Sequence, residues 1–347
     1  MRTACKFAVL CFVLSTLAVA AVGQCKNNRG TWTAEPARDQ PGKLQFRMEC
    51  SQDTGSMGHP LSLTDLQGLD PAAVHGNHAP VKFSLVREAG SLQFEGTFND
   101  GVGYGEFTFT PNQEFLSAMK QMGYADAADK AFTLACIDVT KEYVQELRSL
   151  GFNPDLDKVI GARIFNVNRE QYDGLKAVGV TALDLDNLVQ YRIFNVTPEY
   201  IQEMRKAFPG ISLDKMTQMR IFHVSPEFGS QMSHLGYSGL SVDQLLAFRI
   251  HKVTPDFIEE MGKLGFKKLD ADQLVQFRIF NVNASQVEDL AKEGYTGLSA
   301  QNLVNFRIHH IDAGFIETVK QAGYSHPTPD ELVEFRIMGI RHRRAGL

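Results

Sequence analysis

The sequence predicts an α+β protein of several domains, in which a small antiparallel β domain is followed by an α-helical, solenoid-like repeat array. Two observations predict this fold class. The dipeptide Arg-Ile recurs seven times, and its arginines stand 28 or 29 residues apart. Before the first of them, apolar and polar residues alternate over several short stretches. A fixed period of this size is typical of stacked repeats, and alternation with period two is typical of half-buried strands.

The first segment, residues 1–23, has the pattern of a secretory signal peptide. Arg2 and Lys6 form a basic start, and residues 7–23 form an uncharged, mostly apolar run that ends in small residues. We therefore expect an exported protein, periplasmic or secreted. No membrane span is expected after signal removal, because no other stretch reaches the ~18 apolar residues that a span requires.

Composition and charge narrow the classes of partner. The 347 residues are 44 % hydrophobic and 22 % charged, which is ordinary for a folded globular protein. The formal net charge is −5. A mildly acidic chain is not built to bind a polyanion, so no nucleic acid is expected as a partner.

Three cysteines, Cys25, Cys50 and Cys136, lie beyond the signal segment. We expect a disulfide between Cys25 and Cys50, because both flank the same small domain and an exported protein folds in an oxidising compartment. The alternative is three buried thiols. No Cys-x-x-Cys pair occurs, so the sequence gives no support for a zinc ribbon or a thioredoxin-type site.

Residues 24–110 are expected to form the β domain. Alternating patterns predict strands over residues 43–50 and 81–86 and on both sides of an Asn-Asp-Gly turn at residues 99–101. Glycines at 101, 103 and 105 predict a tight loop or a bulge. They do not form a phosphate loop, because no Lys-Ser/Thr pair follows them.

Residues 111–347 are expected to form an array of helical hairpins of about 29 residues, with a basic C-terminal end. In one first helix, Thr254 is the N-cap, Pro255 takes the first helical position and Gly265 follows the last turn. The second helix of each hairpin starts eight residues before the arginine, at a residue that favours the N-cap position. These residues are Asp155, Asp184, Ser212, Ser241, Asp270, Ser299 and Thr328.

A leucine-rich-repeat-like α/β solenoid is the alternative fold. Leu274, Phe277 and Ile279 have the spacing of the strand in such a repeat. The asparagine of that motif would fall on Val282, however, and the regular N-caps predict a helix at this place. The helical hairpin is therefore favoured.

The arginines are the most regular feature of the array. They are Arg163, Arg192, Arg220, Arg249, Arg278, Arg307 and Arg336. Stacking would bring them into a row, which could bind an anionic partner. The structural interpretation is that each guanidinium bonds carbonyl groups at a helix end or pairs with an aspartate of an adjacent repeat. Because arginine and aspartate recur with the same period, we favour this structural ladder.

From the second position after each arginine, the residues vary between repeats. We call these positions the loop edge, and their variation makes them a candidate binding surface. The candidate residues are Phe165, Asn166, Phe194, Asn195, Phe222, His223, His251, Lys252, Phe280, Asn281, His309 and His310. An equally favoured interpretation is that these loop residues only pack against the next helix.

Catalytic and metal motifs are absent from the sequence. No His-Glu-x-x-His, no zinc-type Cys/His spacing and no Gly-x-Ser-x-Gly occurs. Most carboxylates stand at helix starts, where capping explains them. No catalytic residue, metal ligand or cofactor is therefore expected.

The repeat resembles a known kind of bacterial repeat. Its motifs are Val-Thr-Pro-Glu/Asp-Phe/Tyr-Ile-x-Glu-Met, Gly-Tyr/Phe, Leu-Ser/Asp-x-Asp-Gln-Leu and Phe-Arg-Ile, between Pro111 and Met338. They resemble extracytoplasmic repeats of soil bacteria, which often follow membrane zinc metallopeptidases of the β-lactam-sensor type. The chain has neither the His-Glu-x-x-His nor the several spans of those peptidases, so the resemblance implies an envelope-facing interaction module and no peptidase activity.

We therefore expect an exported, non-enzymatic repeat protein that acts as a protein–protein interaction scaffold in the cell envelope, with a protein partner there. One alternative is a module that binds an envelope glycan or another anionic ligand through the arginines or the loop edge. A second alternative is an enzyme with an unrecognised site in the β domain, which would require a cleft with convergent polar groups.

Overall fold

The computed structural model describes Cys25, residues 27–51 and residues 56–340. The expected signal peptide and the basic end at residues 341–347 lie outside them. Within the described residues an antiparallel sheet precedes a long series of helices, so the α+β layout is confirmed. By internal contacts the chain divides into two compact units after Ile193. The first unit holds the sheet and helices α2 to α7, and the second holds α8 to α17.

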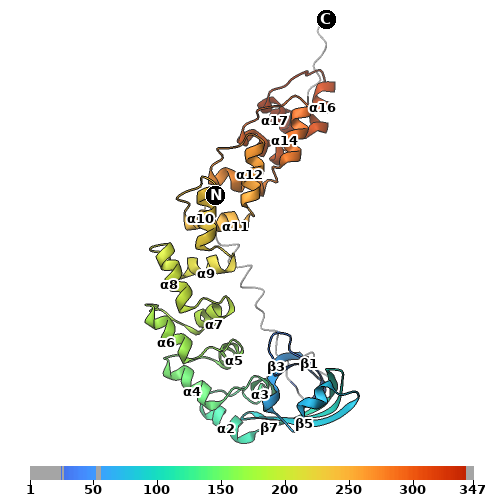
Figure 1. The fold of residues 1–347 in the computed structure, drawn as a ribbon, viewed down its shortest axis with the longest axis vertical. Coiled ribbons are helices and arrows are strands. Elements are labelled where there is room, and N and C mark those ends of the chain that lie inside the picture. Colours follow the sequence, from blue (N-terminus) through green and yellow to red (C-terminus); the bar gives the residue numbers. More distant parts are fainter. Residues whose placement is uncertain (1–24, 26, 52–55, 341–347) are drawn as a thin grey trace. The chain divides into compact units, whose positions relative to one another are not determined.

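The sheet has seven strands in the order β3-β2-β1-β7-β6-β5-β4, with every neighbouring pair antiparallel. It curls around one buried face (Figure 1). The strands are β1 (Arg29–Pro36), β2 (Lys43–Cys50), β3 (Ser56–Ser62), β4 (Leu66–Gln67), β5 (Ala79–Arg87), β6 (Gly90–Asn99) and β7 (Val102–Pro111). Exposed and buried side chains alternate strictly along β2, as the sequence pattern predicts.

Trp32 is the centre of the sheet's core. Its ring packs against four phenylalanines, which are Phe46, Phe83, Phe94 and Phe98. Its indole Nε1 donates to the carbonyl oxygens of Glu95 and Glu106, at 3.2 and 3.1 Å. The hydrogen-bonding capacity of this buried side chain is therefore satisfied, as a buried indole requires.

One of the clustered glycines, Gly103, makes room for that indole. A Cβ added to Gly103 would come within 2.7 Å of the Trp32 ring, whereas a Cβ added to Gly105 would meet the backbone of Glu95 and Gly96 in β6. Both glycines lie inside β7. The expectation of a loop or bulge at these two positions is therefore wrong, and only Gly101, with φ of 88°, lies in the turn.

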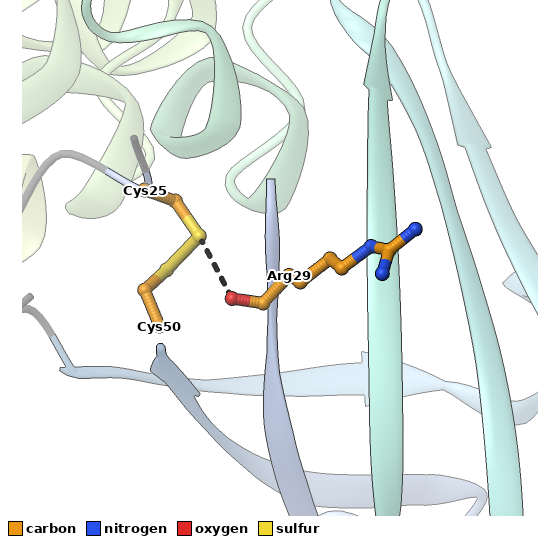
Figure 2. Close-up of a disulfide and its surroundings, with 3 residues drawn as sticks. All are labelled: Cys25, Arg29 and Cys50. Atoms are coloured by element: carbon orange, nitrogen blue, oxygen red, sulfur yellow. Dashed lines mark hydrogen bonds between the residues drawn. A yellow bond between two sulfur atoms is a disulfide. The ribbon is translucent and has the colours of Figure 1, made fainter. Parts of the chain in front are cut away.

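Cys25 and Cys50 form a disulfide (Figure 2), with their Cα atoms 5.3 Å apart. It ties the segment before β1 to the end of β2, and both side chains are buried. Cys136 is a free, buried thiol in α3. Burial raises the pKa of this thiol far above its ordinary value, so it is a packing residue rather than a nucleophile.

The helices are short and regular. They are α2 (Gln113–Gln121), α3 (Ala131–Cys136), α4 (Lys141–Ser149), α5 (Leu156–Ile164), α6 (Arg169–Ala177), α7 (Leu185–Ile193), α8 (Pro198–Ala207), α9 (Leu213–Ile221), α10 (Pro226–His234), α11 (Val242–Ile250), α12 (Pro255–Lys263), α13 (Ala271–Ile279), α14 (Ala284–Lys292), α15 (Ala300–Ile308), α16 (Ala313–Gln321) and α17 (Pro329–Met338). The second helices of the hairpins are the odd-numbered ones from α5 to α17.

Local sequence explains where these helices begin. The side chain of each predicted second-helix N-cap accepts a hydrogen bond from the backbone amide three residues later, as Asp155 does from the Lys158 amide at 2.8 Å. The other six do the same. Each cap satisfies a donor that the helix leaves unpaired.

The leucine-rich-repeat alternative is wrong for the described residues. Leu274, Phe277 and Ile279 lie in helix α13, and the corresponding segments of the other repeats are also helices. Successive second helices contact one another: α5 contacts α7 in the first unit, and α9, α11, α13, α15 and α17 contact in order in the second.

Helices α3 and α4, which follow the sheet in the chain, make direct contacts with it. Phe132 of α3 stacks on Phe107 of β7, with ring centroids 5.4 Å apart, and meets Phe109 edge-on. The Lys141 amide at the start of α4 donates to the Glu88 carboxylate at 3.0 Å. For this reason the first compact unit contains helices as well as the sheet.

Candidate functional site

The loop edge of the array is built by a backbone feature that the sequence analysis did not identify. Six of its residues have positive φ, between 51° and 56°, and they are Asn166, Asn195, His223, Lys252, Asn281 and His310. Their side chains are exposed. In the first, degenerate repeat Asp138 occupies the same position with φ of 60°. The loop edge therefore holds its variable side chains in a left-handed conformation that L residues disfavour.

The left-handed residue closes each second helix. The Val253 amide donates to the Phe248 carbonyl at 2.7 Å, and the Lys252 amide donates to the Arg249 carbonyl at 3.2 Å. This pair of bonds is the Schellman ending, in which glycine is the usual left-handed residue. The first helices do use glycine there, as at Gly265 with φ of 98°. The second helices α5 to α15 keep a side chain at a place where glycine costs less, whereas α17 has Gly339 there, with φ of 84°.

Replacing Lys252 with glycine is therefore expected to raise the free energy of unfolding by about 0.5–1 kcal/mol, because the left-handed strain is relieved. Lys252→Ala is the matched control: it removes the same side chain but keeps a Cβ, so it is expected to give no gain. Urea unfolding followed by circular dichroism would measure both. Equal stabilities of the two variants would contradict the strain argument.

The arginines hold the loop edge in place. Four of these arginines reach back with their side chains to the loop of the preceding repeat. Arg163 Nε donates to the Asp138 carbonyl at 2.9 Å, and Arg220 Nε to the Asn195 carbonyl at 3.2 Å. Arg278 and Arg336 donate to the carbonyls of His251 and His309, at 3.3 and 3.0 Å. These contacts are of the kind that the structural interpretation of the arginine row expects.

Two arginines use side-chain partners instead. Arg192 donates to Asn168 and Gln171, at 3.1 Å each. Arg307 donates to the equivalent pair, Asn283 and Gln286, at 3.3 and 2.9 Å. The first member of each pair is the N-cap of the preceding first helix in the same hairpin. The arginine thus joins the two helices of a hairpin.

The remaining arginine contacts are with aromatic rings of the first helices. The guanidinium carbon of Arg249 lies 3.8 Å from the Phe228 ring centroid, and burial lowers the pKa of Arg249. Four further rings accept an arginine in the same way: Tyr143, Tyr200, Phe257 and Phe315. A cation over a ring is stabilised by the ring's negative face. Most of the row is therefore engaged within the array.

Asp138 is the residue that joins this ladder to the sheet. Its carboxylate accepts from Arg163 Nη2 at 3.0 Å and lies 3.5 Å from Arg87 Nε of β5. Arg87 also pairs with Asp65, at 2.6 Å. The repeat motif does not reveal this cluster, because Ala135 stands where the first repeat would have its arginine. The signal was the spacing: Asp138 stands three residues after Ala135, as Asn166 stands three after Arg163.

His59 of β3 lies close to the same cluster. Burial lowers the pKa of His59, and the positive charges of Lys43, Arg163 and Arg87 lower it further. The imidazole is therefore neutral at neutral pH. Among the described residues, the carboxylates of Asp65 and Asp138 in this cluster pair with Arg87 and Arg163.

The loop-edge candidates separate into two groups by burial. The aromatic or histidine residue that directly follows each second helix is half-buried: Phe165, Phe194, Phe222, His251, Phe280 and His309. Burial lowers the pKa of His251. The next residue in each repeat is the exposed, left-handed one. The side chains of the first group are therefore partly covered, and those of the second group are exposed.

Two grooves of similar construction lie on the second unit. One, of about 610 Å³, is lined by residues that include Phe266, Tyr295 and Leu298. The other, of about 290 Å³, includes Phe208, Tyr237 and Leu240. Tyr237 and Tyr295 occupy equivalent positions two repeats apart, and each hydroxyl donates to a backbone carbonyl of the next repeat. Each groove is thus lined by residues from neighbouring pairs of helices, and the tyrosine hydroxyls are already bonded.

Within the described residues, no group of three or more His, Cys, Asp or Glu side chains could hold a metal ion. No helix in that part of the chain is long and apolar enough to cross a membrane. Comparison with known protein families finds no family that matches the chain, and comparison with curated proteins finds no similar sequence.

Proposed function

We propose that this protein is an exported, non-enzymatic interaction scaffold of the cell envelope, and that the loop edge of a helical solenoid is its binding surface. One observation carries the proposal. Six exposed side chains are kept in left-handed backbone conformation, although glycine would fit there at lower cost. Strain of this kind is retained where the side chain is needed.

The arginine contacts support the same proposal. Because an arginine holds the loop before it through a carbonyl, the loop keeps its shape while its exposed side chain varies from Asn to His to Lys. A rigid row of varied side chains favours recognition of a protein surface. The same contacts leave the arginines poorly disposed to act as an anion ladder.

Export and the bacterial envelope enter the proposal from the sequence. The N-terminal pattern of a basic start and an apolar run supports export. The resemblance to extracytoplasmic repeats supports an envelope partner. A disulfide between Cys25 and Cys50 is compatible with an oxidising compartment.

The test is affinity capture with three loop-edge side chains replaced together. His223→Asn, Lys252→Asn and His310→Asn remove the side-chain chemistry and keep a residue that tolerates the left-handed conformation. The wild-type chain is expected to capture a discrete partner from the envelope fraction, and the triple variant is expected to lose it. Tyr104→Ala, an exposed change on the sheet, is the control. Unchanged capture by the triple variant would remove the loop edge from the proposal.

A further inference from the structure

A groove of about 610 Å³ lies on the exposed face of the sheet, away from the repeated arginines and the loop edge. Its lining includes Thr33, Glu35, Gln45, Arg47 and Gly58, from strands β1, β2 and β3. Thr33 and Gly58 stand on the two sides of Arg47 in the strand pairing. Glu35 stands opposite Gln45. The volume is in the range of small-molecule sites in proteins.

Gly58 is the residue of this groove that calls for an explanation, because a glycine inside a strand weakens the strand. Packing explains the other strand glycines. An added Cβ would come closer than 3.0 Å to a neighbouring atom at Gly30, Gly90, Gly96, Gly103 and Gly105. At Gly58 an added Cβ would meet nothing closer than the Phe46 carbonyl oxygen, at 3.7 Å, which is an ordinary contact. Packing therefore does not require this glycine.

Backbone geometry does not require Gly58 either. Its φ is not positive. The pairing of β2 with β3 passes through it without a bulge, from Lys43 with Ser62 to Glu49 with Ser56. A strand glycine that lacks these reasons is typical of a place where another group approaches the backbone closely. Gly58 is exposed, so the space above it is available to a ligand.

The side chains around Gly58 offer hydrogen bonds of both kinds. The Gln45 amide nitrogen donates to a carbonyl of its own strand at 3.3 Å, which leaves the amide oxygen as an acceptor. The Thr33 hydroxyl can donate and accept, and the Glu35 carboxylate accepts. Arg47 Nε donates to the Glu49 carboxylate at 3.0 Å, and the same guanidinium carries two further nitrogen donors.

The charges of the lining favour a neutral ligand. Glu35 and Arg47 are the two charged residues that line the groove, and their formal charges cancel. Arg47 also pairs with Glu49, so an anion would find no unpaired cation there. Val102, which is 52 % exposed, adds an apolar wall. A sugar matches this combination, because its hydroxyls both donate and accept and its ring carbons carry apolar C–H groups.

We propose that the groove at Gly58 binds a neutral glycan, with one sugar ring placed over the glycine. Thr33, Glu35 and Gln45 bond the hydroxyls of the sugar, and Val102 contacts its C–H groups. A peptide does not fit the same place, because an extended peptide adds to a sheet along its edge, whereas these side chains lie on its face. This site goes beyond the scaffold function proposed above, and it shares no residue with the loop edge.

Binding of the full chain to an array of short oligosaccharides is the test. The array holds neutral hexose and N-acetylhexosamine oligomers, and uronic acid oligomers form the acidic set. We expect the chain to retain neutral oligomers. High salt is expected to leave this retention unchanged, because no ion pair with the ligand is formed. Retention of the acidic set alone, or of no oligomer, would overturn the proposal.

Gly58→Val is expected to change binding and stability in opposite directions. Valine favours a strand, and its Cβ fits without a clash, so the urea midpoint of unfolding is expected to rise. Its side chain occupies the groove, so the affinity for the retained oligomer is expected to fall at least tenfold in isothermal titration calorimetry. A more stable variant does not lose binding by misfolding. Unchanged affinity, or a lower midpoint that shows a backbone need for glycine, would overturn the proposal.

Thr33→Val with Gln45→Val tests the hydrogen-bonding groups and is also expected to weaken binding at least tenfold. Thr108→Val with Gln93→Val is the matched control. These two residues are of the same types, are exposed, face each other in the β6–β7 pair and do not line the groove. An equal loss in the control would overturn the assignment to this groove. Glycan binding involves no loop-edge residue, so its outcome is independent of the capture experiment.

Discussion

Replacing Cys50 with serine is expected to lower the free energy of unfolding of the sheet by about 3.5 kcal/mol. The disulfide joins residues that are 25 positions apart. Closing a loop of that length in the unfolded chain accounts for the expected loss in the chain-entropy description. Both cysteines are also buried, with exposed fractions of 7 and 6 %. The sheet contains β1 and β2 as neighbours, so the bond supports one edge of the core around Trp32.

Trp32 provides the measurement, because it is the one tryptophan of the chain and lies in the sheet's core. Urea unfolding followed by its fluorescence is expected to show the loss in Cys50→Ser. Wild-type protein treated with a reductant is expected to unfold at the same urea concentration as the variant. The variant itself is expected not to respond to the reductant. A wild-type midpoint that does not move on reduction would contradict a stabilising role for the bond.

The helical part of the fold could be predicted well from the sequence, because its determinants are local. Asp155 and Ser241 are N-caps, Pro255 is the first residue of α12, and Gly265 has the positive φ expected after a first helix. Each of these features depends on residues within one helical turn. The 28- to 29-residue period then placed every second helix in the described chain correctly.

The order of strands and the roles of single residues in the sheet could not be predicted in the same way. The pairing of β1 with β7 joins residues 69 to 79 positions apart, from Ala34 with Gly103 to Arg29 with Thr108, and no local pattern specifies it. Gly103 and Gly105 were expected in a bulge, since a cluster of glycines usually marks one. Gly103 instead leaves room for the rings of Phe98 and Trp32, and Gly105 for the backbone of Glu95 and Gly96, all of which come from other strands.

The candidate site was located by sequence but not explained by it. The left-handed conformation of Lys252 and His223 is unusual for those residue types, so their identity gave no warning of it. Asparagine at three of the six positions was the available signal. The burial of one motif position also differs along the chain: Ile164 is half-buried, whereas Ile279 in the same motif is exposed.

Replacing Asp138 with alanine is expected to destabilise the first unit by about 2 kcal/mol. The change removes the carboxylate between the guanidinium groups of Arg87 and Arg163, whose side chains are 18 and 27 % exposed. Breaking a fully buried ion pair in this way costs about 3–5 kcal/mol, and the partial exposure of these groups reduces the effect. The new residue must also hold the left-handed conformation, in which alanine is strained.

Two further substitutions separate these contributions. Asp138→Asn keeps a residue that tolerates positive φ and removes only the charge, so it is expected to lose about 1 kcal/mol. Asp138→Gly relieves the strain but leaves the guanidinium groups unpaired. If the ion pairs dominate, asparagine and glycine are both less stable than the wild type in urea unfolding. If neither variant is less stable than the wild type, the carboxylate contributes nothing to stability, and contacts such as Phe132 on Phe107 and the Lys141 amide on Glu88 hold the sheet to the helices.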